Sequence, residues 1–197
     1  VTPNDDAALV GDEAKMLFDA FAHMPVSVWC GRNKKAMVKR AVRAGAQVVL
    51  IDDGMQRTDI AKDLDIAVVP SEQPFGNGKL LPAGPLREPV QALKRADIAV
   101  VMGAKKLDLA IESINLQPML LPESIKPLFG KKLVAFAAIG RPQKFFDSLT
   151  KAGLNVIEAV NFADHHHYTE AELEQLKQKA KEWRGVLVTT AKDAVKL

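Results

Sequence analysis

Val48-Val49-Leu50-Ile51-Asp52-Asp53-Gly54-Met55-Gln56 is the stretch from which the fold class of this chain is predicted. A short aliphatic run that ends at two carboxylates and a glycine is typical of a buried parallel strand leading into a site. Ligands of open α/β sheets bind at that carboxyl edge. Two adjacent acids there can hold Mg²⁺ against the phosphates of a nucleotide. Ordinary turn chemistry, in which the acids only begin the next turn, explains the same residues.

Patterns typical of helices and strands alternate on both sides of this stretch. Helices are expected over 14–24, 32–44 and 90–96, and strands over 25–29, 64–69 and 98–102. A second alternation begins at Lys132, with strands over 133–138, 155–159 and 186–190, a helix through Phe145, Phe146 and Leu149, and a helix over 170–183. Such alternation predicts an α/β protein with parallel sheets. We expect one lobe over 1–112, a linker over 113–131 and a smaller α/β lobe over 132–197.

The composition limits the classes of partner. A formal net charge of +3 is compatible with phosphate ligands or an anionic membrane surface. With 6% aromatic residues and no basic run interleaved with them, we expect no nucleic-acid binding. Cys30 is the single cysteine, which excludes a disulfide within the chain and favours a reducing compartment. No run approaches the roughly 18 to 20 apolar residues that span a bilayer. The sequence begins at Val1 without a signal-peptide pattern, and we expect a segment to be missing in front of it.

A long loop follows the strand expected at 64–69. The segment from Phe75 to Pro89 contains three glycines and three prolines, so it cannot form regular structure. Loops of this length in compact domains are usually functional. Its backbone amides, together with Lys79 and Arg87, can surround an anion.

Several acidic residues and histidines are candidates for catalysis. Asp12 and Glu13 begin a helix, where capping alone accounts for acids. The run Asp164-His165-His166-His167 directly precedes another helix, and an imidazole oriented by a carboxylate can relay a proton near neutral pH. A surface turn capped by Thr169 is the alternative, and an Asp-His-His triplet also occurs in metal-dependent phosphoesterases, which need further ligands.

The end of the chain offers one more candidate segment. Residues 189–196, Thr-Thr-Ala-Lys-Asp-Ala-Val-Lys, follow the last expected strand. They can bring Lys192 or Asp193 to the same cleft, or form a solvated chain end.

An ordered set of these segments resembles the tetraacyldisaccharide 4′-kinase family. The resemblance rests on Val10-Gly11-Asp12-Glu13, Asp52-Asp53-Gly54-Met55-Gln56, the loop from Gly76 to Pro89, Phe136-Ala137-Ala138-Ile139-Gly140, Asp164-His165-His166 and Lys192-Asp193-Ala194-Val195-Lys196. These segments occur in the family's order over nearly the whole chain, and the glycine-proline loop is the most specific of them.

The resemblance implies a fold and an activity. The family has a P-loop-kinase fold and transfers the γ-phosphate of ATP, with Mg²⁺, to the 4′-hydroxyl of an acylated disaccharide lipid A precursor. It works in peripheral contact with the cytoplasmic face of the inner membrane, through a segment not found in this sequence. Without that segment, the chain is expected to be soluble by itself.

By the same resemblance, the family's functional residues map onto this chain. Asp52 and Asp53 would hold Mg²⁺, and Asp12 would be the base for the sugar hydroxyl, assisted by Asp164, His165 and His166. The residues implied for binding substrate or phosphate are Glu13, Gln56, Asn77, Arg87 and Glu88.

The sequence also departs from the family pattern. No Gly-x-x-x-x-Gly-Lys-Ser/Thr loop is present, because Lys79 and Lys131 are followed by Leu80 and Lys132. Arg57 replaces a histidine of the family and Ala191 replaces a glutamate. We therefore expect a truncated chain with little or no kinase activity by itself. The alternatives are a relative that binds nucleotide or lipid sugar without catalysis, and a metal-dependent phosphoesterase.

Overall fold

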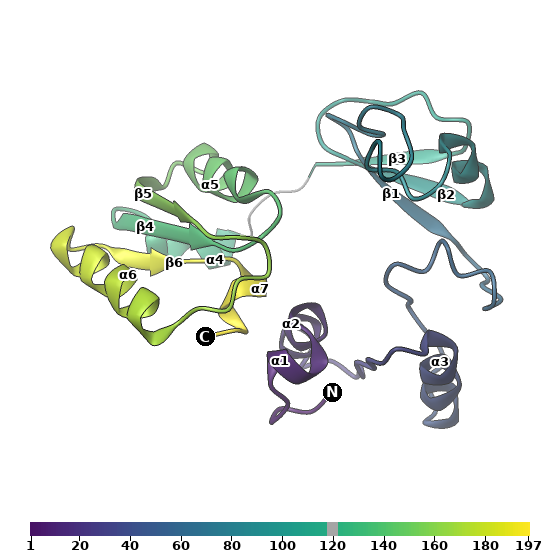
Figure 1. Ribbon diagram of the computed structural model, residues 1–197, viewed down its shortest axis with the longest axis horizontal. Coiled ribbons are helices and arrows are strands. Elements are labelled where there is room, and N and C mark those ends of the chain that lie inside the picture. Colours follow the sequence, from purple (N-terminus) through teal and green to yellow (C-terminus); the bar gives the residue numbers. More distant parts are fainter. Residues whose placement is uncertain (118–121) are drawn as a thin grey trace. The chain divides into compact units, whose positions relative to one another are not determined.

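The computed structural model describes residues 1–117 and 122–197 and divides into two compact units (Figure 1). The first unit combines Val1–Ala46 with Leu120–Leu197, and the second is Gln47–Met119. This grouping differs from the lobes expected from the sequence, because the first 46 residues join the C-terminal lobe. The lobe boundaries expected at residues 112 and 132 remain a prediction.

A three-stranded parallel sheet forms the centre of the first unit. Its strands are β4 (Lys132–Ala137), β5 (Asn155–Asn161) and β6 (Val186–Val188), in the order β5-β4-β6. Ala135 of β4 pairs with Ala159 on one side and Val188 on the other. Because β4 is the middle strand and is buried from Leu133 to Ala137, it forms the core of this unit. The three strands predicted from the sequence are confirmed.

Two helices pack against this sheet. They are α5 (Pro142–Lys151) and α6 (Glu170–Glu182), which lie along opposite sides of the sheet in Figure 1. Phe146 and Leu149 of α5 form a hydrophobic cluster with alternate residues of β4. Leu176 and Ala180, one helical turn apart, are the buried residues of α6. The strand-helix-strand connections are those of an α/β fold with parallel strands, as predicted.

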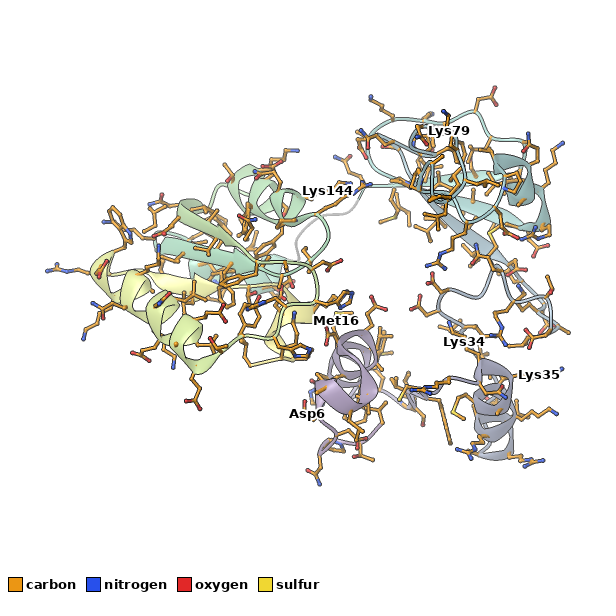
Figure 2. The ribbon with its side chains drawn as sticks, in the orientation of Figure 1. Asp6, Met16, Lys34, Lys35, Lys79 and Lys144 are labelled. Carbon is orange, nitrogen blue, oxygen red and sulfur yellow. The ribbon has the colours of Figure 1, made fainter. Side chains whose placement is uncertain are left out.

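Short helices complete the first unit. They are α1 (Ala7–Val10), α2 (Asp12–Ala20), α3 (Lys34–Arg43), α4 (Pro122–Ile125), the 3₁₀ turn η2 (Lys126–Leu128) and α7 (Ala191–Ala194). Asp6 caps α1 through the amide of Ala8 (Figure 2), and Asn33 caps α3 through the amide of Ala36. Helix α2 packs against α7, so the beginning and the end of the chain meet in this unit.

The second unit contains the other parallel sheet. Its strands are β1 (Ile66–Pro70), β2 (Ile98–Met102) and β3 (Ser113–Leu116), in that order, and the 3₁₀ helix η1 (Val90–Arg95) precedes β2. Strands β1 and β2 were predicted, whereas β3 lies in the segment expected to be a linker. The remainder of that segment includes residues 118–121, which lie outside the described residues.

The strand predicted over Val48–Ile51 does not form. These residues are irregular, and the exposed fractions of Val48 and Leu50 are 77% and 91%. A strand needs a neighbour that satisfies its backbone groups, and no described strand pairs with this segment. The strand predicted over 25–29 is irregular as well. Aliphatic composition alone was therefore a poor guide at these two places.

No helix in the described part of the chain is both long enough and apolar enough to cross a bilayer.

The packing of α6 can be tested with two neighbouring residues of that helix. Truncating buried Leu176 to alanine leaves a cavity against the sheet, and we expect the free energy of unfolding to fall by about 2 to 5 kcal/mol. The matched change Lys177→Ala removes an exposed side chain, and we expect an effect below about 0.5 kcal/mol. Denaturant unfolding followed by circular dichroism measures both. Equal losses would show that α6 is not packed as described.

Candidate functional site

The closest pairing of predicted catalytic residues joins Asp12 and His165. Asp12 is the first residue of α2, and its Oδ2 lies 3.3 Å from Nδ1 of His165. His165 lies in the loop after β5, and its backbone amide donates to the carbonyl of Ala138, directly after β4. The pair therefore lies at the carboxyl edge of the parallel sheet, where α/β proteins bind ligands.

The backbone at His165 is unusual. Its φ of +59° lies in the left-handed region, which only Asp53 and Arg184 share among the described residues other than glycine. Histidine and aspartate tolerate this region better than most residues, yet the conformation costs of the order of 1 kcal/mol or more. Such positions are frequent at functional sites, and two of these three residues were singled out from the sequence.

The neighbouring residues Asp164 and His166 have different surroundings. Oδ1 of Asp164 lies 4.0 Å from Nε2 of His165, on the ring edge away from Asp12. His166 turns away from Asp12: its Nε2 lies 3.0 Å from Glu172, and its ring stacks on Phe162 with centroids 5.1 Å apart. These contacts favour a supporting role for His166.

Glu172 was not identified from the sequence as a site residue. Its carboxylate accepts hydrogen bonds from the amide and the hydroxyl of Thr169 and contacts His166. These hydrogen bonds lower the pKa of Glu172 to about 2. The largest effect comes from the backbone amide of Thr169, followed by His166 and the hydroxyl of Thr169. The sequence signal was available, since Thr-x-x-Glu before a helix is a capping box.

Asp193 in α7 is a fully buried carboxylate of this unit. Its Oδ2 accepts from the amide of Ala138 at 3.1 Å and from the hydroxyl of Thr190 at 2.7 Å, and its Oδ1 lies 2.7 Å from Nζ of Lys196. Burial by itself raises the pKa of Asp193, but the hydrogen bonds from Lys196, Thr190 and Ala138 outweigh it, so the pKa lies below the ordinary value. Burial, followed by the charge of Asp193, raises the pKa of Tyr168.

The same end of the chain contacts Glu13. Nζ of Lys192 lies 3.2 Å from Oε1 of Glu13, which is exposed beside Asp12. The segment 189–196 is therefore not a solvated chain end. Instead, α7 packs against α2, and Lys192 contacts Glu13. This agrees with the other alternative considered for the segment, in which Lys192 or Asp193 approaches the candidate catalytic residues.

The second unit holds the residues implied for Mg²⁺ and phosphate. Oδ2 of Asp53 lies 3.3 Å from both terminal nitrogens of Arg87, and the two side chains are 66% and 61% exposed. Asp52 precedes Asp53 in the same turn, and Gln56 is exposed beyond Gly54. Exposed ion pairs of this kind contribute little stability. Within the described residues, no group of three or more His, Cys, Asp or Glu side chains could hold a metal ion.

The glycine-proline loop is held by its own hydrogen bonds. Asn77 donates to the carbonyl of Ala83 at 2.9 Å and accepts from the amide of Lys79 at 3.1 Å, and Figure 2 shows Lys79 in this loop. A Cβ at Gly84 would lie 2.1 Å from Oδ1 of Asn77, so only glycine fits there. In this conformation the side chain of Asn77, implied to bind substrate or phosphate, holds the loop together. Glu88 forms an ion pair with Arg95 at 2.6 Å.

The low pKa of Glu172 predicts how stability depends on pH. Because the folded-state pKa is about 2 and the ordinary value is 4.5, the ionised carboxylate stabilises the fold above about pH 4.5, and this contribution is lost as the pH falls towards 2. Glutamine keeps the capping geometry but removes the charge. The difference in melting temperature between wild type and Glu172→Gln should therefore shrink across this range.

Glu174→Gln, an exposed position on the same helix, is the matched control for this titration. A constant difference between wild type and Glu172→Gln from pH 7 to 2.5 would contradict the prediction.

Comparisons with known proteins identify the family to which the chain is similar. The sequence profile of LpxK, tetraacyldisaccharide-1-P 4′-kinase, matches residues 1–197. The tetraacyldisaccharide 4′-kinase of Gluconobacter oxydans is 42% identical over 100% of this chain and 59% of its own length. The enzyme of the same name from Hyphomonas neptunium is 42% identical over 95% of this chain and 56% of its own length.

A solved structure shares the fold. The crystal structure of LpxK from Aquifex aeolicus in complex with ATP has a TM-score of 0.77 and 24% sequence identity, covering 98% of this chain and 62% of that protein. The chain spans a little under three fifths of the length of the two curated relatives. On the match to the family profile and to these relatives, the chain belongs to the tetraacyldisaccharide 4′-kinase family.

Proposed function

We propose that this protein acts in the ATP-dependent phosphorylation of the 4′-hydroxyl of a tetraacyldisaccharide 1-phosphate, a lipid A precursor. The names of its relatives support the reaction class. The observation that carries the proposal is the contact between Asp12 and His165 at the carboxyl edge of the first sheet. A carboxylate and an imidazole at hydrogen-bond distance form a unit that can take a proton from an attacking hydroxyl.

The roles of the two residues follow from their placement. Asp12 is largely buried at the start of α2, so its carboxylate is held in one position, whereas His165 is exposed and can reach a substrate. In the transfer, the 4′-oxygen forms a bond to the γ-phosphorus while the bond from that phosphorus to its bridging oxygen breaks. The hydroxyl proton passes to the Asp12–His165 pair. Positioning of this kind supplies most of the catalysis in phosphoryl transfer.

Asp52 and Asp53 are proposed to hold Mg²⁺. Mg²⁺ prefers oxygen ligands and is often bound by one or two carboxylates together with phosphates, and two adjacent exposed carboxylates fit this requirement. When bound, the ion would neutralise charge on the phosphates. Arg87, beside Asp53, is the proposed phosphate contact of this unit. Because the sequence has no Gly-x-x-x-x-Gly-Lys-Ser/Thr loop, no phosphate cradle is assigned within these residues.

The acylated substrate implies a membrane setting. We propose peripheral action at the cytoplasmic face of the inner membrane, because a disaccharide with acyl chains resides in a bilayer. The mild positive charge of the chain is compatible with an anionic lipid surface.

The Asp12–His165 pair can be tested in the complete gene product with ATP, Mg²⁺ and the acylated disaccharide. Asp12→Asn removes the proton acceptor, and we expect kcat to fall by about 100-fold or more. His165→Gln should lower kcat as well, whereas the neighbouring change His167→Gln serves as the control and should leave it unchanged. Wild-type rates for Asp12→Asn would remove Asp12 from the mechanism, and an inactive wild-type protein would refute the proposed function.

The proposed Mg²⁺ ligands give a separate test. Asp53→Asn removes one anionic ligand, and we expect the Mg²⁺ concentration for half-maximal rate to rise by about tenfold or more. Asp63→Asn, an exposed aspartate of the same unit, is the control. An unchanged Mg²⁺ dependence in Asp53→Asn would exclude Asp53 as a ligand.

A further inference from the structure

Lys196 places a buried ammonium group behind the Asp12–His165 pair. Its side chain is 2% exposed, and lysine is almost never buried to this degree unless it is paired. Nζ lies 2.7 Å from Oδ1 of Asp193 and donates to the carbonyl of His166 at 3.2 Å. It also lies 5.3 Å from the centre of the Tyr168 ring and 4.0 Å from Oδ2 of Asp12.

These contacts join three separate parts of the first unit. Asp12 begins α2, His166 belongs to the loop after β5, and Asp193 belongs to α7. The ammonium group is within hydrogen-bond distance of His166 and Asp193, and its charge lies 4.0 Å from the carboxylate of Asp12. The same oxygen of Asp12, Oδ2, lies 4.0 Å from Nζ of Lys196 and contacts Nδ1 of His165.

Ala138 connects the same parts through its backbone. Its amide donates to Asp193, and its carbonyl accepts from the amide of His165. Lys196 and Ala138 thus form a closed set of contacts with Asp193 and the loop of residues 164–167. These contacts link the loop both to α7 and to the end of β4.

We propose that Lys196 is a positioning residue for the Asp12–His165 pair, an inference that rests on the proposed kinase function. By contacting Asp12 and the carbonyl of His166 together, Lys196 sets the separation between the carboxylate and the imidazole beside it. The opposing interpretation is a buried ion pair with Asp193 that serves folding alone. The two interpretations differ in whether the effect of Lys196 depends on Asp12.

A double-mutant cycle separates the two interpretations. In the complete gene product, Lys196→Met should lower kcat by about 100-fold with little change in KM, because misplacement of a catalytic group slows the chemical step. In an Asp12→Asn background, the same change should have little further effect, because positioning acts through Asp12. Equal losses in both backgrounds, or a change in KM alone, would overturn the proposal.

Two variants serve as controls for this cycle. Lys179→Met removes another lysine-carboxylate pair of the same unit, the one between Lys179 and Glu158, and should leave kcat unchanged. Lys196→Arg keeps the positive charge and should restore part of the rate. Melting temperatures are recorded for every variant, and a rate loss that follows the melting temperature in all of them would support the folding interpretation instead.

A labelling experiment covers the case in which Lys196→Met does not fold, since that change leaves Asp193 buried without its cation. Lysines of the wild-type protein and of Asp12→Ala are acetylated with an amine-reactive reagent, and mass spectrometry compares Lys196 with exposed Lys177. Loss of Asp12 should raise the labelling of Lys196 by about threefold or more, as its enclosure opens. Unchanged labelling would overturn the proposal. The labelling experiment does not depend on kinase activity. It therefore tests the role of Lys196 even if the proposed kinase function is wrong.

Discussion

The buried carboxylate of Asp193 is the interaction on which the site in the first unit depends. A charge removed from water is costly unless every oxygen is paired, and here the amide of Ala138, the hydroxyl of Thr190 and the ammonium of Lys196 supply the partners. Because Ala138 follows the central strand β4, the carboxylate connects the last helix to the core of the sheet. Displacing any of these groups leaves the buried carboxylate of Asp193 without one of its partners. The contacts of Ala138, Thr190 and Lys196 with Asp193 therefore depend on one another.

This arrangement also explains why one histidine of the loop differs from the next. Asp164 and His165 form a turn in which the backbone at His165 is left-handed, and the ring of His165 contacts Asp12. His166 packs between Phe162 and Tyr168 and contacts Glu172, so its ring supports the loop. The imidazole of His165 is therefore exposed to solvent, whereas that of His166 packs within the loop.

The sequence predicted much of the fold because its signals were local. Strand 98–102 follows an expected helix and strand 133–138 precedes one, and both form. The strand over 48–51 was wrong because an apolar run shows only that a segment can be paired, and pairing is decided by distant residues. Strand β3, Ser-Ile-Asn-Leu, is too short for its alternation to stand out. Asp12 and His165 were implied by the family resemblance, which carries information about distant pairs that periodicity lacks. Lys196 was missed because nothing local indicates that a lysine near the end of a chain is buried.

The fit of Asn77 into the space above Gly84 has a consequence for recognition. An amide side chain that makes two hydrogen bonds to its own loop replaces the solvent that would otherwise surround those backbone groups. A loop ordered in this way loses little conformational freedom when a second molecule arrives, so more of the contact energy remains as affinity. In general, a preformed loop selects its ligands by shape, since it excludes molecules that a flexible segment would accommodate.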